Sequence, residues 1–274
     1  MSSHSERNDR RKPSASGRDF PHKSRNKQGF SKGGNDEKDW IWGIHAVEAA
    51  LANPARPAPK RLLATPDRAK RLAPHLAKLP CLQILEGPDI ARQLPQGAAH
   101  QGLALKIDEP EPLSIFELGT PAEGFLVMLD QITDPQNVGA IFRSAAAFGA
   151  RGVILQDRHA PTLSGVLAKT AVGAIDKTPY ARVVNLSRAL EELAELGWRA
   201  IGLAGEAEET LEVVLDGTPT VLVLGSEGEG VRRLVAEHCD AMGKIAMPGG
   251  FESLNVSAAA AIALYETSRI SRRG

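Results

Sequence analysis

Residues 244–266 read KIAMPGGFESLNVSAAAAIALYE, a short apolar run that breaks at residues 248–250 (Pro-Gly-Gly) and then enters a helix rich in small residues. The helix entry carries three polar residues, Ser253, Asn255 and Ser257. A helix needs one such residue to cap its first turn. The double glycine also lets backbone approach a ligand closely. The stretch therefore predicts either a binding site or a capped core helix, and the rest of the chain has to decide between them.

Length and composition place the chain among soluble globular proteins. It has 274 residues, of which 42% are hydrophobic and 24% are charged, so about two domains are expected. No run approaches the roughly 20 apolar residues that cross a bilayer, and the N-terminus does not have the pattern of a secretory signal. Cys81 and Cys239 lie far apart and near no cluster of metal ligands. This favours a reducing compartment, the cytoplasm, without a disulfide framework, a metal site or a membrane partner.

The formal net charge of zero conceals an asymmetry. Residues 1–38 hold ten Lys or Arg against five Asp or Glu, which leaves 23 basic and 28 acidic residues in the remainder. A basic arm on a mildly acidic body recurs in proteins that touch nucleic acid, although solubilising tails have the same composition. Because residues 1–38 have almost nothing to bury, we expect them to be disordered in isolation.

Residues 39–107 predict a small α/β domain. The expected strands are 60–64, 82–85 and 102–107, and the expected helices are 44–51 and 66–79. Basic residues follow the second helix, as they would on an RNA-binding surface or on any solvated helix face. The acidic, proline-bearing segment that starts at Asp108 predicts a linker over 108–122.

Residues 123–274 predict a second α/β domain. The expected strands are 125–129, 152–155, 183–184, 199–203, 220–224 and 244–246, and the expected helices are 137–148, 164–172, 187–196, 231–239 and 254–270. Short, nearly all-apolar strands that alternate with helices indicate a mostly parallel sheet with helices on both faces. Ligands bind beyond the carboxyl ends of such strands. The loops after residues 129, 224 and 246 are therefore the informative ones.

The first loop leads into the helix 137–148. Asp134 followed by Pro135 makes a reasonable helix start. Arg143 lies about 160° from the centre of the apolar stripe of this helix, at 100° per residue, and so faces away from its own core. An outward arginine is usually solvated. The residues around it are small enough for another surface to pack there: Gly139, Ala140, Ser144 and Ala147.

The second loop, 225–230, reads GSEGEG. A glycine-rich turn between strand and helix lets backbone N–H groups approach a ligand, although it can equally be a flexible turn. A dinucleotide fingerprint would need G-x-G-x-x-G after the first strand. Here the order is G-x-x-G-x-G after a late strand, and Glu227 and Glu229 would repel a pyrophosphate. The loop suits a ligand that donates hydrogen bonds or carries positive charge.

Polar groups thus arise beyond the ends of three strands: Asn137, Arg143, Glu227, Ser253 and Asn255. Three segments that contain them resemble the ordered motifs of the SpoU/TrmH group of RNA ribose 2′-O-methyltransferases: 134–149 (DPQNVGAIFRSAAAFG), 223–234 (VLGSEGEGVRRL) and 245–266. Segments 42–51 (WGIHAVEAAL) and 99–105 (AHQGLAL) resemble the substrate-binding domain of bacterial members that methylate a guanosine of 23S ribosomal RNA. The resemblance covers about residues 40–270.

The resemblance implies a catalytic domain with a deep trefoil knot, S-adenosyl-L-methionine as methyl donor, RNA (23S rRNA) as substrate, and a homodimer that shares its active site. It assigns catalytic roles to Asn137, Arg143, Glu227, Ser253 and Asn255. It assigns donor contacts, largely through backbone, to Gly225, Ser226, Ile245, Met247 and Leu254. Two departures affect the shape of the third loop: Ala246 stands where proline is common, and residues 248–251 are an unusual variant.

The resemblance leaves the proton acceptor open. A guanidinium stays protonated at neutral pH, so Arg143 is a poor base. Our hypothesis is that Arg143 fixes the nucleotide's phosphate and hydroxyl, while Glu227 holds a donor group or Arg143 itself. The alternatives are an RNA-binding ribosome-assembly protein without catalysis, a tRNA 2′-O-methyltransferase, and a nucleotide-dependent dehydrogenase, which the glycine pattern disfavours.

Overall fold

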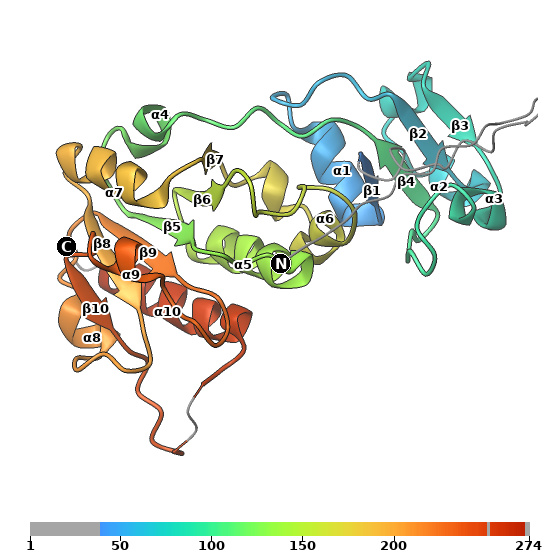
Figure 1. Cartoon of the computed structure of the whole chain (residues 1–274). Helices are drawn as coiled ribbons and strands as arrows, with labels where there is room; N and C mark the ends of the chain where they lie inside the picture. Colours follow the sequence, from blue (N-terminus) through green and yellow to red (C-terminus); the bar gives the residue numbers. More distant parts are fainter. Residues whose placement is uncertain (1–38, 251–252, 272–274) are drawn as a thin grey trace, which may run out of the picture. The chain divides into compact units, whose positions relative to one another are not determined.

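The computed structural model describes residues 39–250 and 253–271, and these lie within one compact unit. They form two β-sheets that follow one another along the chain (Figure 1). The prediction of disorder for residues 1–38 falls outside the described residues. Within the part that is described, no helix has both the length and the apolarity needed to cross a membrane.

The first sheet has the strand order β1-β4-β2-β3. Its strands are β1 (Trp40–Trp42), β2 (Arg61–Ala64), β3 (Leu82–Ile84) and β4 (Leu103–Lys106). Alternate residues of a strand face opposite sides of a sheet. Leu62 and Leu105 accordingly share a core with α1 (Ile44–Ala52), whereas Leu63 and Ala104 pack with Ile90 of α3 (Gly87–Ala91). The small N-terminal α/β domain expected from the sequence is present.

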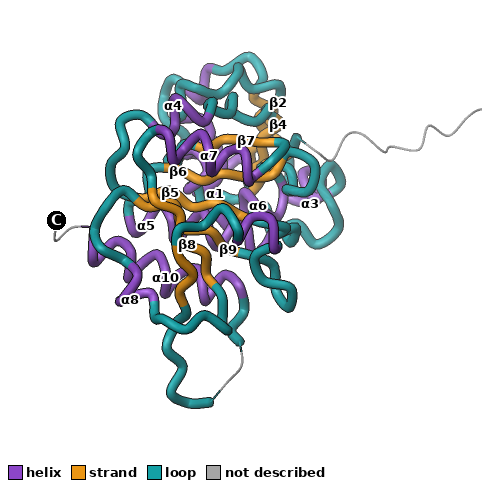
Figure 2. The backbone as a smooth tube through the Cα atoms, turned by 60° about the vertical axis from the view of Figure 1, so that its left-hand side comes forward, coloured by secondary structure: helices purple, strands orange, loops and turns teal. Residues whose placement is uncertain are grey.

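The second sheet has the order β10-β8-β9-β5-β6-β7, and every pairing in it is parallel. Its strands are β5 (Phe125–Leu129), β6 (Gly152–Gln156), β7 (Tyr180–Val183), β8 (Arg199–Leu203), β9 (Thr220–Leu224) and β10 (Ala241–Gly243). Because β5, β6 and β9 are buried along their whole length, helices have to cover both faces. Figure 2 shows them there. The predicted doubly covered parallel sheet is confirmed.

Seven helices accompany this sheet in the described part of the chain: α4 (Ile115–Gly119), α5 (Pro135–Phe148), α6 (Gly165–Ala171), α7 (Leu186–Glu195), α8 (Leu211–Val214), α9 (Arg233–Ala236) and α10 (Val256–Ser271). Residues of one strand parity, such as Val127 and Val153, pack with α5, α6 and α10. Residues of the other parity, such as Leu126 and Ile154, pack with α4 and α7. The strand alternation therefore separates two cores, one on each face of the sheet.

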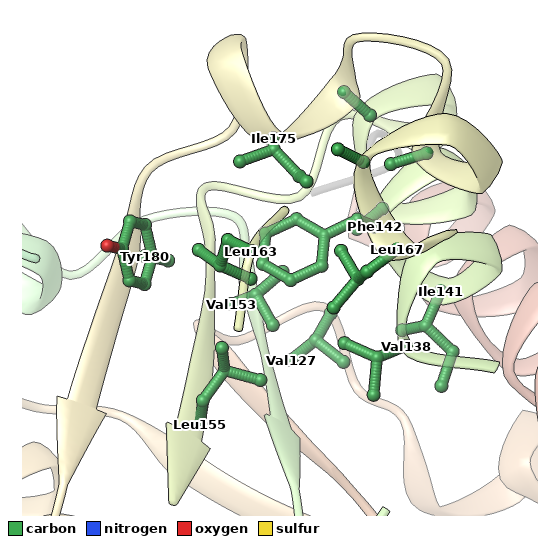
Figure 3. Packing of buried hydrophobic residues seen from close by; sticks show 14 of the residues in the cluster. Val127, Val138, Ile141, Phe142, Val153, Leu155, Leu163, Leu167, Ile175 and Tyr180 are labelled. Atoms are coloured by element: carbon green, nitrogen blue, oxygen red, sulfur yellow. The ribbon is translucent and has the colours of Figure 1, made fainter. Parts of the chain in front are cut away.

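Phe142 of α5 lies at the centre of the first core, beside Leu163, Leu167 and Ile175 (Figure 3). Its side chain is fully buried, so truncation to alanine would cost about 3–5 kcal/mol. Close packing also fixes α5 against α6, because a Cβ on Gly139 would lie 2.6 Å from the backbone oxygen of Leu167.

Helix α5 begins as the sequence predicts. The carboxylate of Asp134 accepts hydrogen bonds from the backbone N–H groups of Gln136 and Asn137, with Pro135 at the first helical position. Gly149 ends the helix with φ 80°, a left-handed conformation that glycine adopts at little cost. Arg143 is exposed, on the side away from Val138, Phe142 and Ala145, as expected.

Several predicted elements need correction. The helix predicted over 66–79 is a four-residue helix, α2 (Pro66–Ala69), followed by a 3-10 turn (Leu76–Lys78). Pro74 stands between them, and neither piece buries a residue, so no packing holds a longer helix. The helix predicted over 231–239 shortens to α9. Helices α3, α4 and α8 were not predicted, and α4 lies inside the segment predicted as a linker.

Two strand predictions were misplaced. The strand predicted at 183–184 is β7, which ends at Val183, and Val184 is 71% exposed. The strand predicted at 244–246 is β10, which ends at Gly243, and Lys244 makes only an isolated bridge to Thr210. In both cases the short apolar pattern was real, but the pairing with a neighbouring strand set the register.

A buried ion pair joins the segment after α1 to the end of the 3-10 turn η2 (Ala174–Asp176). Arg56 Nε lies 2.5 Å from Asp176 Oδ1, and the two side chains are 1% and 3% exposed. Asn53 Nδ2 also donates to Asp176, and Arg56 donates to the backbone oxygen of Asp108. Each charge is therefore fully partnered, which a buried pair requires.

Candidate functional site

A cavity of about 650 Å³ opens at the carboxyl ends of β8 and β9. Its lining comes from three segments after strands of the second sheet: residues 203–206, residues 224–230, and the stretch from Ile245 and Met247 to residues 253–256 and Ala259. Drug-sized ligands occupy pockets of roughly 300–1,000 Å³. The position, beyond the ends of parallel strands, is the one expected for a ligand in such a sheet.

The turn after β9 forms one wall of this cavity. Ser226 and Gly230 exchange backbone hydrogen bonds, from Gly230 N at 3.0 Å and from Ser226 N at 3.2 Å, and close the turn. A Cβ on Gly225 would lie 1.9 Å from the backbone carbon of Gly230. Backbone cannot yield as a side chain can, so only glycine fits at position 225.

A buried carboxylate after β5 holds the segment that follows the turn 225–230. Asp130, directly after β5, is fully buried and accepts from Arg232 N at 2.8 Å and from Arg232 Nε at 2.7 Å. The sequence reading assigned no role to Asp130 or Arg232. The sequence did contain a signal for Asp130, because an acidic residue directly after an apolar strand of a parallel sheet lies at the carboxyl end of that strand, where ligands bind.

Three of the predicted catalytic residues contact one another: Asn137, Glu227 and Asn255. Glu227 Oε1 accepts from Asn255 Nδ2 at 2.7 Å, from the backbone N–H of Val256 at 3.1 Å, and from Asn137 Nδ2 at 3.5 Å. Asn255 Nδ2 also donates to Asn137 Oδ1 at 3.2 Å. Glu227 therefore holds donor groups at the entry of α10, and its catalytic role stays a prediction.

Asn255 also caps α10. Its Oδ1 accepts from Ser257 N at 3.0 Å, Ser257 Oγ at 2.6 Å and Ala258 N at 3.4 Å. The predicted helix cap is confirmed, whereas the predicted binding site stays a prediction. The same asparagine uses its oxygen to cap the helix and its nitrogen to join Glu227 and Asn137. Neighbouring Ser253 and Leu254 are exposed and line the cavity.

Arg143 lies apart from this cluster. It is exposed on α5, does not line the cavity, and makes no hydrogen bond or ion pair with any residue in the described ranges 39–250 and 253–271. Of the expected site residues, the structure thus joins Asn137, Glu227 and Asn255, and places Ser253 at the rim. The five residues expected to contact the donor all line the cavity: Gly225, Ser226, Ile245, Met247 and Leu254.

The cavity is acidic. Glu206, Glu227 and Glu229 line it, and none of the described Lys or Arg residues does. Such a site favours a cationic ligand and disfavours a pyrophosphate, which argues against a dinucleotide-dependent dehydrogenase. The sequence analysis did not predict that residues 203–206 line the cavity. It did predict β8 correctly, and the rule that ligands bind beyond the carboxyl ends of strands would have indicated this segment. In the described residues, these glutamates included, no group of three or more His, Cys, Asp or Glu side chains is placed to hold a metal ion.

Comparisons with known proteins agree with this geometry. Residues 124–265 match the model of the SpoU rRNA Methylase family, and residues 40–113 match the model of the RNA 2′-O ribose methyltransferase substrate-binding domain. The chain is 39% identical, over 84% of its length, to the 23S rRNA (guanosine-2′-O-)-methyltransferase RlmB of Photobacterium profundum, and covers 97% of it. It is 37% identical to RlmB of Pseudomonas aeruginosa over 84% of its length and 95% of that protein.

Other relatives are longer. The chain spans about three fifths of the length of mycobacterial proteins described as uncharacterized tRNA/rRNA methyltransferases, for example that of Mycolicibacterium vanbaalenii, with 41% identity over 69% of this chain and 62% of the relative.

Solved structures show the same fold. The SpoU methyltransferase AviRb from Streptomyces viridochromogenes, in complex with AdoMet, superposes with a TM-score of 0.72 at 24% identity, over 86% of this chain and 91% of that one. A protein from Porphyromonas gingivalis described as a putative RNA methyltransferase of the TrmH family gives a TM-score of 0.68 at 26% identity, over 86% and 90% of the two chains. With both domains matched, the chain belongs to the SpoU rRNA methylase family.

Proposed function

We propose that this protein transfers a methyl group from S-adenosyl-L-methionine to the 2′-hydroxyl of a ribose in RNA, and that the target is a guanosine of 23S ribosomal RNA. The two RlmB relatives carry this activity in their names and match the chain along nearly their whole length. The observation that carries the proposal is the cavity at the ends of β8 and β9, which is lined by all five residues assigned to the donor.

The residues of the cavity fit S-adenosyl-L-methionine. Its sulfonium and ammonium groups are cationic, and the cavity presents Glu206, Glu227 and Glu229. Its adenosine and ribose need backbone donors and acceptors at close range, which the turn at Gly225 and Ser226 and the segment around Ile245 and Met247 can supply. Leu254 gives an apolar contact. The donor, when bound, supplies an activated methyl group as an electrophile.

The chain's own residues position the acceptor. Methyl transfer forms the bond between the 2′-oxygen and the methyl carbon while the sulfur–carbon bond breaks and the hydroxyl proton leaves. Positive charge disappears in this step, so positioning contributes most, and it can be worth several kcal/mol. Glu227 and Asn137 hold Asn255 in place, and Ser253 and Asn255 border the cavity on the side where the ribose would enter.

Arg143 acts in this proposal as an anchor for the phosphate and hydroxyl of the target nucleotide, with the proton leaving to that phosphate or to water. A protonated guanidinium is a planar fork of donors that suits a phosphate. Because Arg143 lies on the outer side of α5, we propose that it serves the cavity of a second subunit in a homodimer. A trefoil knot in the catalytic domain and a cytoplasmic location complete the proposal. So do the domain boundaries 39–107, 108–122 and 123–274.

Incubation with labelled S-adenosyl-L-methionine and ribosomal RNA tests the proposal. The expected result is label on a ribose of 23S rRNA with wild-type protein and none with Arg143→Ala. Donor binding without transfer would instead support an RNA-binding assembly protein, and transfer to tRNA alone would move the substrate to the class that the mycobacterial names mention. Absence of donor binding would refute the proposed activity.

A further inference from the structure

A second cavity, of about 400 Å³, lies in the N-terminal domain and outside the site described above. Its lining includes Thr65, Asp67, Arg68, Arg71, His100 and Gln101. His100 and Gln101 belong to segment 99–105, which the sequence reading singled out and to which the proposed methyl-transfer chemistry gives no role.

The arginines of this cavity are available to a ligand. Arg68 Nε donates to the backbone oxygen of Gln101 at 3.1 Å, which orients the guanidinium, and its terminal nitrogens have no hydrogen-bond partner among the described residues. Among residues 39–250 and 253–271, no carboxylate pairs with Arg68 or Arg71, and the nearby Asp67 lies 4.0 Å from Lys70. Both guanidinium groups can therefore donate into the cavity.

His100 and Thr65 also offer donors to the cavity. His100 Nδ1 accepts from the backbone N–H of Gly102 at 3.0 Å, so the ring proton sits on Nε2 and can be donated even when the imidazole is neutral. Partial burial lowers the pKa of His100, which favours that neutral form. The hydroxyl of Thr65 adds a further donor. A cavity with five donor side chains (Thr65, Arg68, Arg71, His100 and Gln101) and a single carboxylate is suited to a ligand rich in acceptors.

We propose that this cavity binds a backbone phosphate of the substrate RNA, with Arg68 and Arg71 as its principal contacts. The proposal rests on the proposed function, since it takes RNA as the substrate. Guanidinium groups bind phosphate through two parallel hydrogen bonds, and phosphate contacts fix the register of a nucleic acid without reading its sequence. The cavity is a subsite for anchoring RNA, separate from the donor cavity.

The backbone around Gln101 supports a built site. Gln101 has φ 55° and Gly102 has φ 81°, a left-handed pair that costs energy at a non-glycine position and recurs at binding sites. A Cβ on Gly102 would lie 2.6 Å from Thr65 Oγ1 and 3.0 Å from Arg68 Cγ, so this turn sets the positions of two lining side chains.

Gln101 also connects the cavity to the second sheet's helices. Its Oε1 accepts from the backbone N–H of Ile44 at 3.3 Å and from Lys169 Nζ, on α6, at 2.7 Å. Helix α6 packs on α5 at Gly139, and α5 carries Asn137 and Arg143. The residue that orients Arg68 is thus hydrogen-bonded to a helix that supports the proposed catalytic residues.

The test measures RNA binding across a range of salt concentrations, with the full chain and a 23S rRNA fragment that the wild-type protein methylates. Arg68→Gln and Arg71→Gln are expected to raise Kd about five- to tenfold and to lower the slope of log Kd against log salt by about one. Lys70→Gln is the matched control, because Lys70 lies in the same segment but does not line the cavity. It should change Kd less than twofold.

Two further measurements make the outcome unambiguous. Arg68→Lys keeps the charge but loses the planar fork, so it should recover only part of the affinity. The Kd for S-adenosyl-L-methionine should be the same in all variants, which separates failure of this proposal from failure of the proposed methyl transfer. Equal effects of Arg68→Gln and Lys70→Gln would overturn the phosphate subsite. Weaker binding of inorganic phosphate by Arg68→Gln, without any change in its RNA affinity, would also overturn the phosphate subsite.

Discussion

Asn255 Nδ2 donates to Glu227 Oε1 at 2.7 Å, and the backbone N–H of Val256 donates to the same oxygen at 3.1 Å. A single carboxylate oxygen thus holds the entry of α10 against the turn after β9. The residue that caps the helix is also the one that completes the wall of the cavity. The shape of the proposed donor cavity and the start of α10 are therefore linked, and substitutions here should change both.

Replacing Glu227 by alanine should weaken S-adenosyl-L-methionine binding about tenfold. The substitution leaves Asn255 Nδ2 and Val256 N without their acceptor, and each lost hydrogen bond to a charged group contributes on the order of 1–3 kcal/mol. Isothermal titration calorimetry measures the change. Glu229→Ala removes an equal charge from the same turn, and no hydrogen bond of Glu229 is recorded in the described residues. If both variants bound equally well, the contact to Asn255 would have no role in the cavity.

Replacing Gly225 by alanine should abolish measurable donor binding and lower Tm. The added Cβ would lie 1.9 Å from the backbone carbon of Gly230, so the turn has to move. Gly249→Ala is the control, because a Cβ there meets nothing within 4 Å. Thermal melting and donor titration on both variants check this, and a Gly225→Ala protein with normal affinity would show that the turn does not contact the donor.

Asp176→Ala should destabilise the fold by about 3–5 kcal/mol, because it leaves Arg56 as a buried charge without its carboxylate. Chemical denaturation gives the free energy of unfolding. Asp67→Ala removes a carboxylate from an ion pair whose side chains are 78% and 90% exposed, and should cost no more than about 1 kcal/mol. A similar small loss for Asp176→Ala would mean that the Arg56 contact does not stabilise the protein.

Arg143→Lys and Arg143→Ala should both lose methyl transfer while Tm and the Kd for the donor stay at wild-type values. Arg143 is exposed and has no partner within the described part of the chain, so nothing in the fold depends on it. If the site is shared between subunits, a heterodimer of Arg143→Ala with Gly225→Ala has one intact site of two. Such mixed dimers should then regain a quarter to a half of the wild-type methyl-transfer activity. Near-full activity of Arg143→Lys would show that the planar guanidinium is unnecessary.

Deleting residues 1–38 should weaken RNA affinity and reduce its salt dependence without changing donor affinity. The segment carries a balance of five positive charges, and such charges bind RNA by releasing counterions. Fluorescence anisotropy with the rRNA fragment at several salt concentrations measures this. Unchanged affinity and slope would assign the segment a role other than RNA binding.

The sequence by itself determined the local features. Hydrophobic periodicity placed five of the six strands of the second sheet within a few residues, and Asp134 followed by Pro135 marked the start of α5 correctly. The outward position of Arg143 followed from helix geometry alone. These features depend on neighbours within about four residues, where steric limits and capping hydrogen bonds act.

Only the tertiary structure decided which of these pieces meet. Asn137 and Asn255 are 118 positions apart, and they join at Glu227 because β9 lies next to β5 in the sheet and α10 packs against α5, β5 and β9. The same strand order brought residues 203–206 to the donor cavity and moved the last strand from 244–246 to Ala241–Gly243. Strand order is set by the burial of two whole faces, which no local pattern encodes. The sequence could therefore supply the members of the site, but the packing of the sheet determined their partners.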